Sequence, residues 1–319
     1  MKTFFKFGLG MAAVLLASCS SNNLDEIAPK EEQSSFPEYD VTVTIPDIEP
    51  GEGETRTTLT PSTSSLSMSL AWAEGDVLGV YSPESSGGNL ATFKIKNVSA
   101  SDPSSAKCDG GGFRLIGGYT YNAVYPYNGN AIDQSTVPVY YDGQNPLSNG
   151  GAEHLGAYDY LAASATATGE NAANFAFQRL GTFMRIRLVV PKAGTYTSLR
   201  IKAPSNVFIM KGQVNLLDTN PAITCVDDSG LSSLIDLPLG SNGNGITLTD
   251  SDLNLVVFVM FPPVNLSSQT LTFTLIDNEG NVSKYSQTGY NMLANKVYGY
   301  IPTAVDSSIS GSGSGYDWG

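Results

Sequence analysis

The sequence has few of the side chains that carry metal or proton-transfer chemistry. Its 319 residues include one histidine and three cysteines. The histidine, His154, follows Gly, Ala and Glu, a context typical of a surface turn. We find no serine–histidine–aspartate order, nucleophile elbow or phosphate-binding loop, and no CxxC or cysteine–histidine cluster that would indicate zinc. We therefore expect a protein that is not an enzyme, with no catalytic residues, no metal site and no cofactor.

Basic residues and long apolar runs are also scarce. The chain has 17 Lys and Arg against 30 Asp and Glu, a formal net charge of −13. This balance argues against nucleic acid and anionic membrane surfaces as partners. No stretch approaches the roughly 20 apolar residues of a transmembrane helix. What is abundant is glycine, proline, tyrosine and phenylalanine among Val, Ile and Thr, a composition that predicts an exported all-β protein with many turns.

The N-terminus has the pattern of a lipoprotein export signal. Lys2 and Lys6 precede an apolar segment at residues 7–16, which is the right length for a signal and too short to span a bilayer. Small residues then lead directly into Cys19, whose thiol is the expected site of acylation. An ordinary signal peptide with an incidental cysteine is the alternative. We expect residues 1–18 to be removed and Cys19 to anchor the precursor in a membrane.

The two remaining cysteines lie far apart in the sequence. Export permits a disulfide between Cys108 and Cys225. The domain boundary proposed below separates them, so we expect two free thiols and leave the disulfide as the alternative.

A strand and a flexible loop follow the polar linker at residues 24–38. The stretch Asp40–Ile45 alternates polar residues with Val41, Val43 and Ile45, which places those three on one buried face. The next segment is rich in Gly, Pro and Glu and contains Arg56. An accessible, extended loop around one basic residue suits a trypsin-like protease. A chance arginine in a solvated loop is the alternative to cleavage between Arg56 and Thr57.

Short apolar runs separated by turn residues continue to the C-terminus. This spacing is typical of a sandwich or barrel, and we treat Asp227–Gly230 and Asp277–Gly280 as turns because they lack calcium-ligand spacing. We expect Leu253–Phe261 to be a central strand, and Tyr140 and Tyr141 to pack in strands, although exposed tyrosines also stack on sugars. The other expected strands are Val77–Tyr81, Ala91–Val98, Phe113–Ile116, Tyr119–Tyr127, Val137–Tyr141, Phe175–Val190, Leu199–Ala203, Val207–Val214 and Lys296–Ile301, with a hairpin around Asp277–Gly280.

The order of several motifs resembles the fimbrillin family of Bacteroidales, the type V pilins. Each motif is weak alone, but together they cover nearly the whole mature chain. Besides Cys19 and the strand before Arg56-Thr57-Thr58, they are Trp72-x-x-Gly75-Asp76-x-Leu78-Gly79-Val80-Tyr81, Phe175-x-Phe177-x-Arg179-Leu180-Gly181-x-Phe183, Phe261-Pro262-Pro263, Asp277-x-x-Gly280 and Leu293-Ala294-Asn295-Lys296-x-Tyr298.

The resemblance implies two transthyretin-like β-sandwich domains in tandem. We place their boundary where Pro191-Lys192-Ala193-Gly194 breaks the long mid-chain strand, which gives domains at residues 57–190 and 191–319. It implies a propeptide, residues 19–56, that an arginine-specific outer-membrane protease removes after Arg56, so that Thr57 becomes the new N-terminus. The loss of Val41, Val43 and Ile45 would open a groove for a strand from another pilin subunit. The expected locations are the outer membrane, the cell surface and then the fimbrium.

The C-terminus departs from the usual stalk subunit because little follows Ile301. Ile301, Val305 and Ile309 share one face and form a candidate donor strand, weakened by the missing amide hydrogen of Pro302. If the tail cannot donate, the resemblance implies a tip subunit that only accepts a strand. The alternative from another class is a surface lipoprotein that binds glycans and never polymerises.

Overall fold

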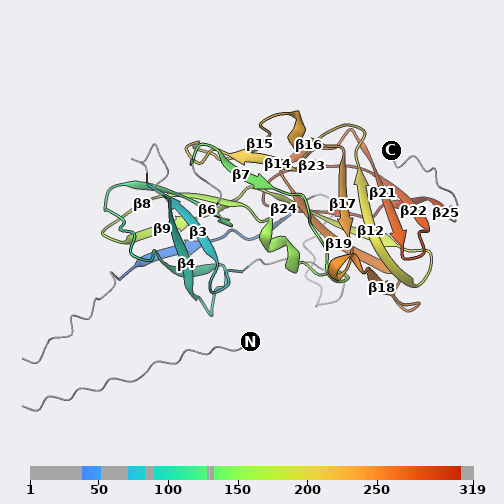
Figure 1. Ribbon diagram of the computed structural model, residues 1–319, viewed down its shortest axis with the longest axis horizontal. Coiled ribbons are helices and arrows are strands. Elements are labelled where there is room, and N and C mark those ends of the chain that lie inside the picture. The colour runs from blue at the N-terminus through green and yellow to red at the C-terminus, as the bar shows by residue number, and fades with distance from the viewer. Residues whose placement is uncertain (1–37, 52–70, 83–89, 128, 130–132, 310–319) are drawn as a thin grey trace, which may run out of the picture. The chain divides into compact units, whose positions relative to one another are not determined.

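The computed structural model describes residues 38–51, 71–82, 90–127, 129 and 133–309 (Figure 1). Throughout these ranges the regular structure is strands, apart from three single-turn 3-10 helices: η1 (Glu153–Ala157), η2 (Asp228–Gly230) and η3 (Ser241–Gly243). No helix in the described ranges is long and apolar enough to cross a membrane. The all-β class predicted from composition is confirmed.

The first large sheet has eight strands in the order β10-β8-β6-β3-β4-β5-β1-β9. One face of this sheet covers a core that includes Trp72, Phe93 and Phe175. That core takes residues from strands across the sheet, including β8 and β9, so the sheet curls around it. The strands are β1 (Asp40–Thr44), β3 (Val77–Tyr81), β4 (Leu90–Val98), β5 (Ser105–Asp109), β6 (Thr120–Tyr125), β8 (Leu161–Thr166), β9 (Ala172–Ala176) and β10 (Gln178–Arg179).

A second core lies between two further sheets. In Figure 1 the labelled strands β12, β17, β21 and β22 of these sheets lie apart from β3, β4 and β8 of the first sheet. Phe273 and Tyr300, one from each sheet, contact each other across this core, with 6.0 Å between the centres of their rings. The first of these sheets has the order β19-β11-β24-β2, with β2 (Glu49–Pro50), β11 (Thr182–Val189), β19 (Asn254–Phe261) and β24 (Lys296–Tyr300). The second has the order β17-β12-β21-β22-β25, with β12 (Gly194–Lys202), β17 (Leu234–Pro238), β21 (Thr270–Asp277), β22 (Val282–Thr288) and β25 (Thr303–Ile309), and β18 (Ile246–Leu248) pairs with β12.

Three small sheets complete the described strands. They consist of β7 (Val137–Tyr140), β14 (Lys211–Val214) and β15 (Ile223–Thr224); β13 (Phe208–Ile209) with β16 (Leu231–Ser232); and β20 (Val264–Asn265) with β23 (Asn291–Met292).

The strand β19 is buried on both faces as expected, but it is not central. It ends its sheet among the described strands, beside β11. Its outer edge is covered by the segment before β8: Gln144 Nε2 donates to the Met260 carbonyl oxygen at 2.6 Å, and Gln144 Oε1 accepts from the Met260 amide at 2.8 Å. Asn149 Oδ1 accepts from the Val256 amide at 2.7 Å. Side chains therefore satisfy an edge that a neighbouring strand would otherwise have to pair.

The strand predicted at Phe113–Ile116 is wrong, although Leu115 is fully buried there. Two of its amides bond to side chains instead of a neighbouring strand: Leu115 donates to Asn171 Oδ1 at 3.0 Å, and Ile116 donates to the Tyr121 hydroxyl at 2.9 Å. The long strand predicted over 175–190 is interrupted as well, into β9, β10 and β11. These three segments belong to two different sheets.

The described residues all belong to one compact unit. Within it, the last buried residue of the first core is Phe177, whereas the second core includes Tyr81, Val124 and Ala162 together with buried residues from Leu180 onward, so the two cores overlap along the sequence. The division into tandem transthyretin-like domains at residues 190 and 191 stays a prediction.

Candidate strand-binding site

The strand β1, the first in the described part of the chain, occupies an interior position in the eight-stranded sheet. β1 pairs antiparallel with β5, where Val41 lies opposite Cys108, and parallel with β9, where Val43 lies opposite Phe175. Among the described strands, β9 forms a ladder with β1 alone. An N-terminal segment therefore completes the sheet between two strands that belong to the body of the protein.

The alternation predicted for this segment is present. Val41 and Val43 are fully buried and Ile45 is nearly so, in the core that also contains Phe93 and Phe175. Thr42 and Thr44 lie on the other face and are half-buried. Strand backbone and apolar side chains together hold the segment in place, and the exposed ion pair between Asp40 and Lys107, 3.1 Å long, adds little.

The thiol of Cys108 lies against this strand. Cys108 is 3% exposed and its Sγ lies 3.7 Å from the carbonyl oxygen of Val41. Burial, together with the charge of Asp109, raises the pKa of Cys108 to about 12. Cys225, which is partly exposed, is the other described cysteine, and both are free thiols, as expected from the sequence.

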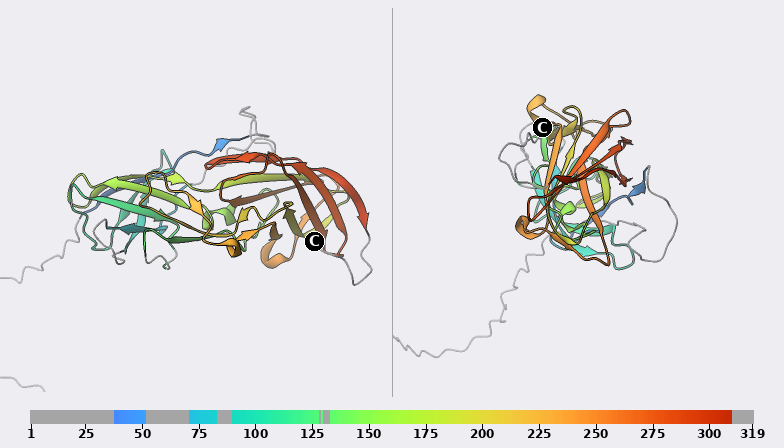
Figure 2. Two further views of the ribbon diagram at one scale, coloured as in Figure 1. Left: turned by 90° about the horizontal axis from the view of Figure 1, so that it is seen from above. Right: turned by 90° about the vertical axis from the view of Figure 1, so that its right-hand side faces the viewer.

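The chain then crosses from the first core to the second along residues 46–51 (Figure 2). Ile48 packs against the second core. β2 pairs parallel with β24, with Glu49 opposite Lys296, and Gly51 donates to the carbonyl oxygen of Val297 at 2.7 Å. This second contact region lies between the predicted strand and the predicted cleavage loop, and no sequence pattern indicated it.

A buried arginine and an asparagine hold the crossing. Arg179 Nε donates to Asp159 Oδ1 at 2.7 Å, and Arg179 Nη1 donates to the Pro46 carbonyl oxygen at 2.9 Å and to Asn295 Oδ1 at 2.7 Å. Asn295 Nδ2 donates in turn to the Asp47 carbonyl oxygen at 2.9 Å. We call Arg179 and Asn295 the carbonyl clamp.

Arg179, the charged member of the clamp, and its counter-ion Asp159 are both shielded from water. The side chains of Arg179 and Asp159 are 0% and 4% exposed, and the guanidinium lies 5.6 Å from the centre of the Phe183 ring. Burial raises the pKa of Asp159, and the neighbouring Arg179 opposes that rise. Hydrogen bonds from a charged donor are the stronger kind, so Arg179 binds the Pro46 carbonyl oxygen firmly, and the neutral amide of Asn295 adds a second bond, to the Asp47 carbonyl oxygen.

Sequence comparisons and structural comparisons differ in outcome. No protein-family model matches the sequence, and neither does any curated protein. Crystal structures that resemble it include two proteins provisionally described as cell adhesion proteins. The one from Bacteroides ovatus has 13% identity and a TM-score of 0.48 over 85% of this chain and 97% of that one. The one from Bacteroides uniformis has 16% identity and a TM-score of 0.48 over 73% and 88%.

A fimbrial assembly protein from Parabacteroides distasonis is also similar, with 7% identity and a TM-score of 0.38 over 82% of this chain and 90% of that one. These descriptions agree with the resemblance read from the motifs.

Several predicted site residues lie outside the described residues, namely Cys19, Arg56 and Thr57. The candidate donor segment is described as far as Ile309, and it is paired within its own chain. β25 is the end strand of its sheet as far as the structure describes the chain, antiparallel to β22, with Ile309 opposite Val282. Ile301 and Val305 are 51% and 66% exposed, so these two apolar side chains have no core of their own here.

The residues weighed for chemistry have structural roles. His154 Nε2 donates to the Phe258 carbonyl oxygen at 3.1 Å, which helps cover the edge of β19, and burial lowers the pKa of the imidazole. Asp277 is buried against the turn, and despite that burial, hydrogen bonds from Asn281 and the Glu279 amide lower its pKa. Its oxygens are thus engaged with N–H donors, and no metal-binding cluster occurs in the described ranges.

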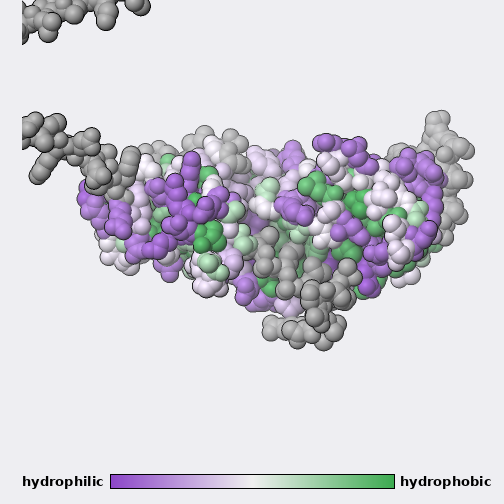
Figure 3. All heavy atoms as spheres, turned by 90° about the horizontal axis from the view of Figure 1, so that it is seen from below, coloured by the Kyte–Doolittle hydropathy of each residue, from purple (hydrophilic) through white to green (hydrophobic). Residues whose placement is uncertain are grey.

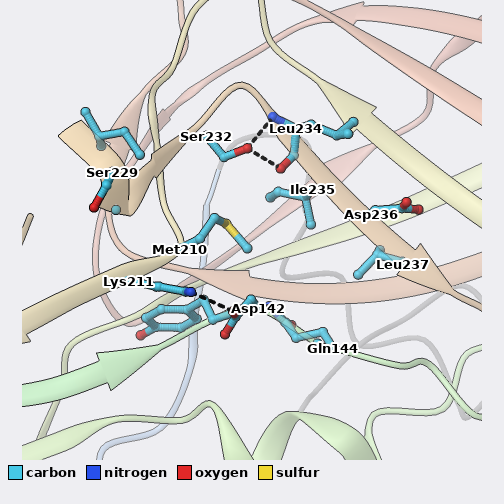
Figure 4. A pocket seen from close by; sticks show the side chains of 14 residues that line it. Asp142, Gln144, Met210, Lys211, Ser229, Ser232, Leu234, Ile235, Asp236 and Leu237 are labelled. Carbon is cyan, nitrogen blue, oxygen red and sulfur yellow. Dashed lines mark hydrogen bonds and ion pairs between the residues drawn. The ribbon is translucent and has the colours of Figure 1, made fainter. Parts of the chain in front are cut away.

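Two adjoining hollows of about 450 and 220 Å³ share Lys211, Ser229 and Gly230. In Figure 4 the larger one has the 3.7 Å ion pair of Lys211 with Asp142 on one side and Ser232 bonded to Leu234 on the other. Tyr140 lines the smaller hollow and is 40% exposed, whereas Tyr141 is fully buried. Figure 3 shows a surface on which apolar patches are separated by polar residues. The Lys211–Asp142 and Ser232–Leu234 pairs of the larger hollow are engaged with each other, whereas the buried hydroxyl of Tyr141, which also lines it, has no hydrogen-bond partner in the described part of the chain.

Proposed function

We propose that this protein is a structural subunit of a surface fimbrium. It is exported as a lipoprotein precursor through Cys19, cut after Arg56 by an arginine-specific protease, and joined to other subunits by strand exchange. Adhesion of the cell is the biological outcome. Residues 19–56 act as a propeptide whose strand fills the site until assembly.

The position of β1 carries this proposal. Among the described residues this strand comes first, yet it is paired on both sides, by β5 and β9. A proteolytic cut in the following loop severs it from the body while every other strand of the sheet remains part of one chain. A terminal strand with this placement is suited to replacement by an equivalent strand from another molecule.

The energy at stake is large enough to drive assembly. Burial of each of Val41, Val43 and Ile45 contributes roughly 1.5–3 kcal/mol, and each ladder hydrogen bond adds roughly 0.5–1.5 kcal/mol. A whole domain is stable by roughly 5–15 kcal/mol. Loss of the strand therefore leaves a body that gains a substantial part of its stability by accepting another strand.

The pairing of β25 with β22 favours an accepting tip subunit as the second candidate. The segment that would donate is hydrogen-bonded within its own chain, so donation requires that pairing to break. An accepting subunit needs no donor strand of its own.

The surface form of the protein tests the proposal. N-terminal sequencing should show that the surface form begins at Thr57, and its intact mass should match a chain from that residue. Both results are expected for the wild type and for Arg114→Ala, a control at the next arginine along the chain. Arg56→Ala should retain the propeptide and fail to enter polymers. A wild-type surface form that begins at acylated Cys19 would contradict maturation as a pilin and would favour the glycan-binding lipoprotein.

A further inference from the structure

The segment that precedes the cleavage loop follows two tracks, and the carbonyl clamp lies between them. The first track is the space between β5 and β9, filled by β1. The second is the edge of β24 that faces away from β11, and β2 pairs with this edge. Pro46 and Asp47, at the crossing, are bound through their carbonyl oxygens by Arg179 and Asn295.

The clamp belongs to the body of the protein and is built without the segment. The Asn295 amide donates to the Gly181 carbonyl oxygen at 2.9 Å, and Asn295 Oδ1 accepts from Arg179. Asn295 has a φ of +59°, a left-handed conformation that asparagine and aspartate tolerate better than most residues. Cleavage after Arg56 therefore leaves both donors fixed in position, directed at acceptors that belong to the severed piece.

An occupied clamp is favoured over an empty one. The guanidinium is buried, and in the described part of the chain its Nη2 already has no hydrogen-bond partner. Removal of the Pro46 carbonyl would take a further acceptor from the same buried charge, a costly loss in a site of low polarity. A strand that fills the first track alone would leave this loss uncorrected.

The second track imposes its own requirements on an occupant. It must run parallel to β24, as β2 does. A side chain at the position of Gly51 would come within 2.7 Å of the Tyr298 ring, so a glycine fits there. Lys296 Nζ lies 3.2 Å from Glu49 Oε2, so an acidic residue suits the position of Glu49.

We propose that the site accepts an extended segment of another protein chain that spans both tracks, with two carbonyl oxygens at the clamp, an acidic residue opposite Lys296 and a glycine against Tyr298. This inference rests on the proposed strand exchange and adds that the partner segment matches residues 40–51 in length, not the single strand β1. The same contacts retain the severed propeptide until such a segment displaces it.

Peptide exchange into the cut protein tests this surface. The full chain is cut after Arg56 and incubated with a fluorescent peptide of residues 38–51 or of residues 38–45 until the native fragment has exchanged, and peptide dissociation is then followed. The longer peptide should dissociate at least about tenfold more slowly, because it adds the clamp and β24 hydrogen bonds, and about 1.4 kcal/mol corresponds to tenfold.

A variant of the clamp separates its role from general stability. Asn295→Asp keeps the oxygen that accepts from Arg179 and loses the donor to Asp47. It should speed dissociation of the longer peptide about fivefold to tenfold and leave the shorter one within about twofold. Asn291→Asp, in β23, adds the same charge nearby and should change neither.

The outcomes distinguish this inference from the function on which it rests. Equal dissociation of the two peptides would overturn the two-track surface and leave strand exchange intact. An equal effect of Asn295→Asp on both peptides would overturn the clamp. If neither peptide enters the cut protein, strand exchange fails together with the inference.

Discussion

Cys108 lies opposite Val41 across β5 and β1, and its Sγ is 3.7 Å from the Val41 carbonyl oxygen. The thiol is 3% exposed, and burial raises its pKa to about 12. Cys108 thus lies in the strand next to the one that we propose is exchanged, and the reactivity of its thiol reports whether that strand is in place. Thiolate is the reactive form of cysteine, so the state of this strand controls the reactivity of Cys108.

We expect the thiol of Cys108 to react slowly with a maleimide in the uncut protein and rapidly after the severed strand has been removed. Both access to the thiol and a fall of its pKa toward its ordinary value act in this direction. Peptide mapping by mass spectrometry distinguishes Cys108 from Cys225 and Cys19. Cys225, whose thiol contacts the carbonyl oxygens of Lys211 and Asp227 and is already partly exposed, should label equally before and after. A Cys108 that stays protected after loss of residues 40–51 would show that the core closes over the vacancy.

The buried pair of Arg179 and Asp159 predicts a large stability effect. Asp159→Asn leaves the guanidinium charge buried without its counter-ion and should lower the free energy of unfolding by about 3–5 kcal/mol. Glu170→Gln is a matched control, because Glu170 pairs with Arg114 at 2.8 Å with both side chains more than half exposed, and it should cost at most about 1 kcal/mol. Urea unfolding measures both. Equal losses in the two variants would mean that burial of the Arg179 pair does not set its strength.

His154 predicts a pH dependence of stability. Burial lowers the pKa of its imidazole, so as the pH falls below about 6.5 the unfolded chain binds a proton before the folded one does. The free energy of unfolding should therefore decrease between pH 7.5 and pH 5.5, by at most about 1.4 kcal/mol per pH unit. His154→Gln keeps a donor for the Phe258 carbonyl and should flatten this slope. Identical slopes in the two proteins would assign the dependence to other groups.

The elements that the sequence predicts well depend on local pattern. The alternation in Asp40–Thr44 and the turn residues between β21 and β22 each define a structure within a few neighbouring residues. Phe113–Ile116 is also an apolar run between turn residues, but the amides of Leu115 and Ile116 bond to Asn171 and Tyr121. Whether an apolar run forms a strand depends on partners that the run itself does not contain.

The candidate site likewise combines features that a local sequence pattern predicts with contacts that no local pattern contains. Val41, Val43 and Ile45 are evident from period two, whereas the clamp joins Arg179 to Asn295 across 116 positions in the chain. Both residues occur in motifs that resemble a known family, yet neither motif indicates that they meet or that they bind residues 46–47. An arginine in a strand sequence is usually a solvated charge, and its burial emerges only from the packing of two cores.

The final prediction concerns the candidate donor segment, residues 301–309. In this structure β25 pairs with β22, and Val305 is 66% exposed. Donation would move Val305 into an apolar groove, with a gain of roughly 1.5–3 kcal/mol for a fully buried valine, against the loss of an edge pairing. If the segment enters a neighbour with Val305 in the place of Val41, a cysteine at Val305 should crosslink between molecules to the native Cys108 of the cut protein. Successive strand residues point to opposite faces, so Ala304→Cys is the matched control and should crosslink poorly. Cys225→Ser removes the other described thiol from both proteins, and gel electrophoresis under non-reducing conditions counts the linked chains.

A chain that ends at Tyr300 should cap polymers without extending them, because it keeps the groove and lacks the donor. Polymers that still extend from that truncated chain, or equal crosslinking from Ala304→Cys, would show that this segment is not the donor.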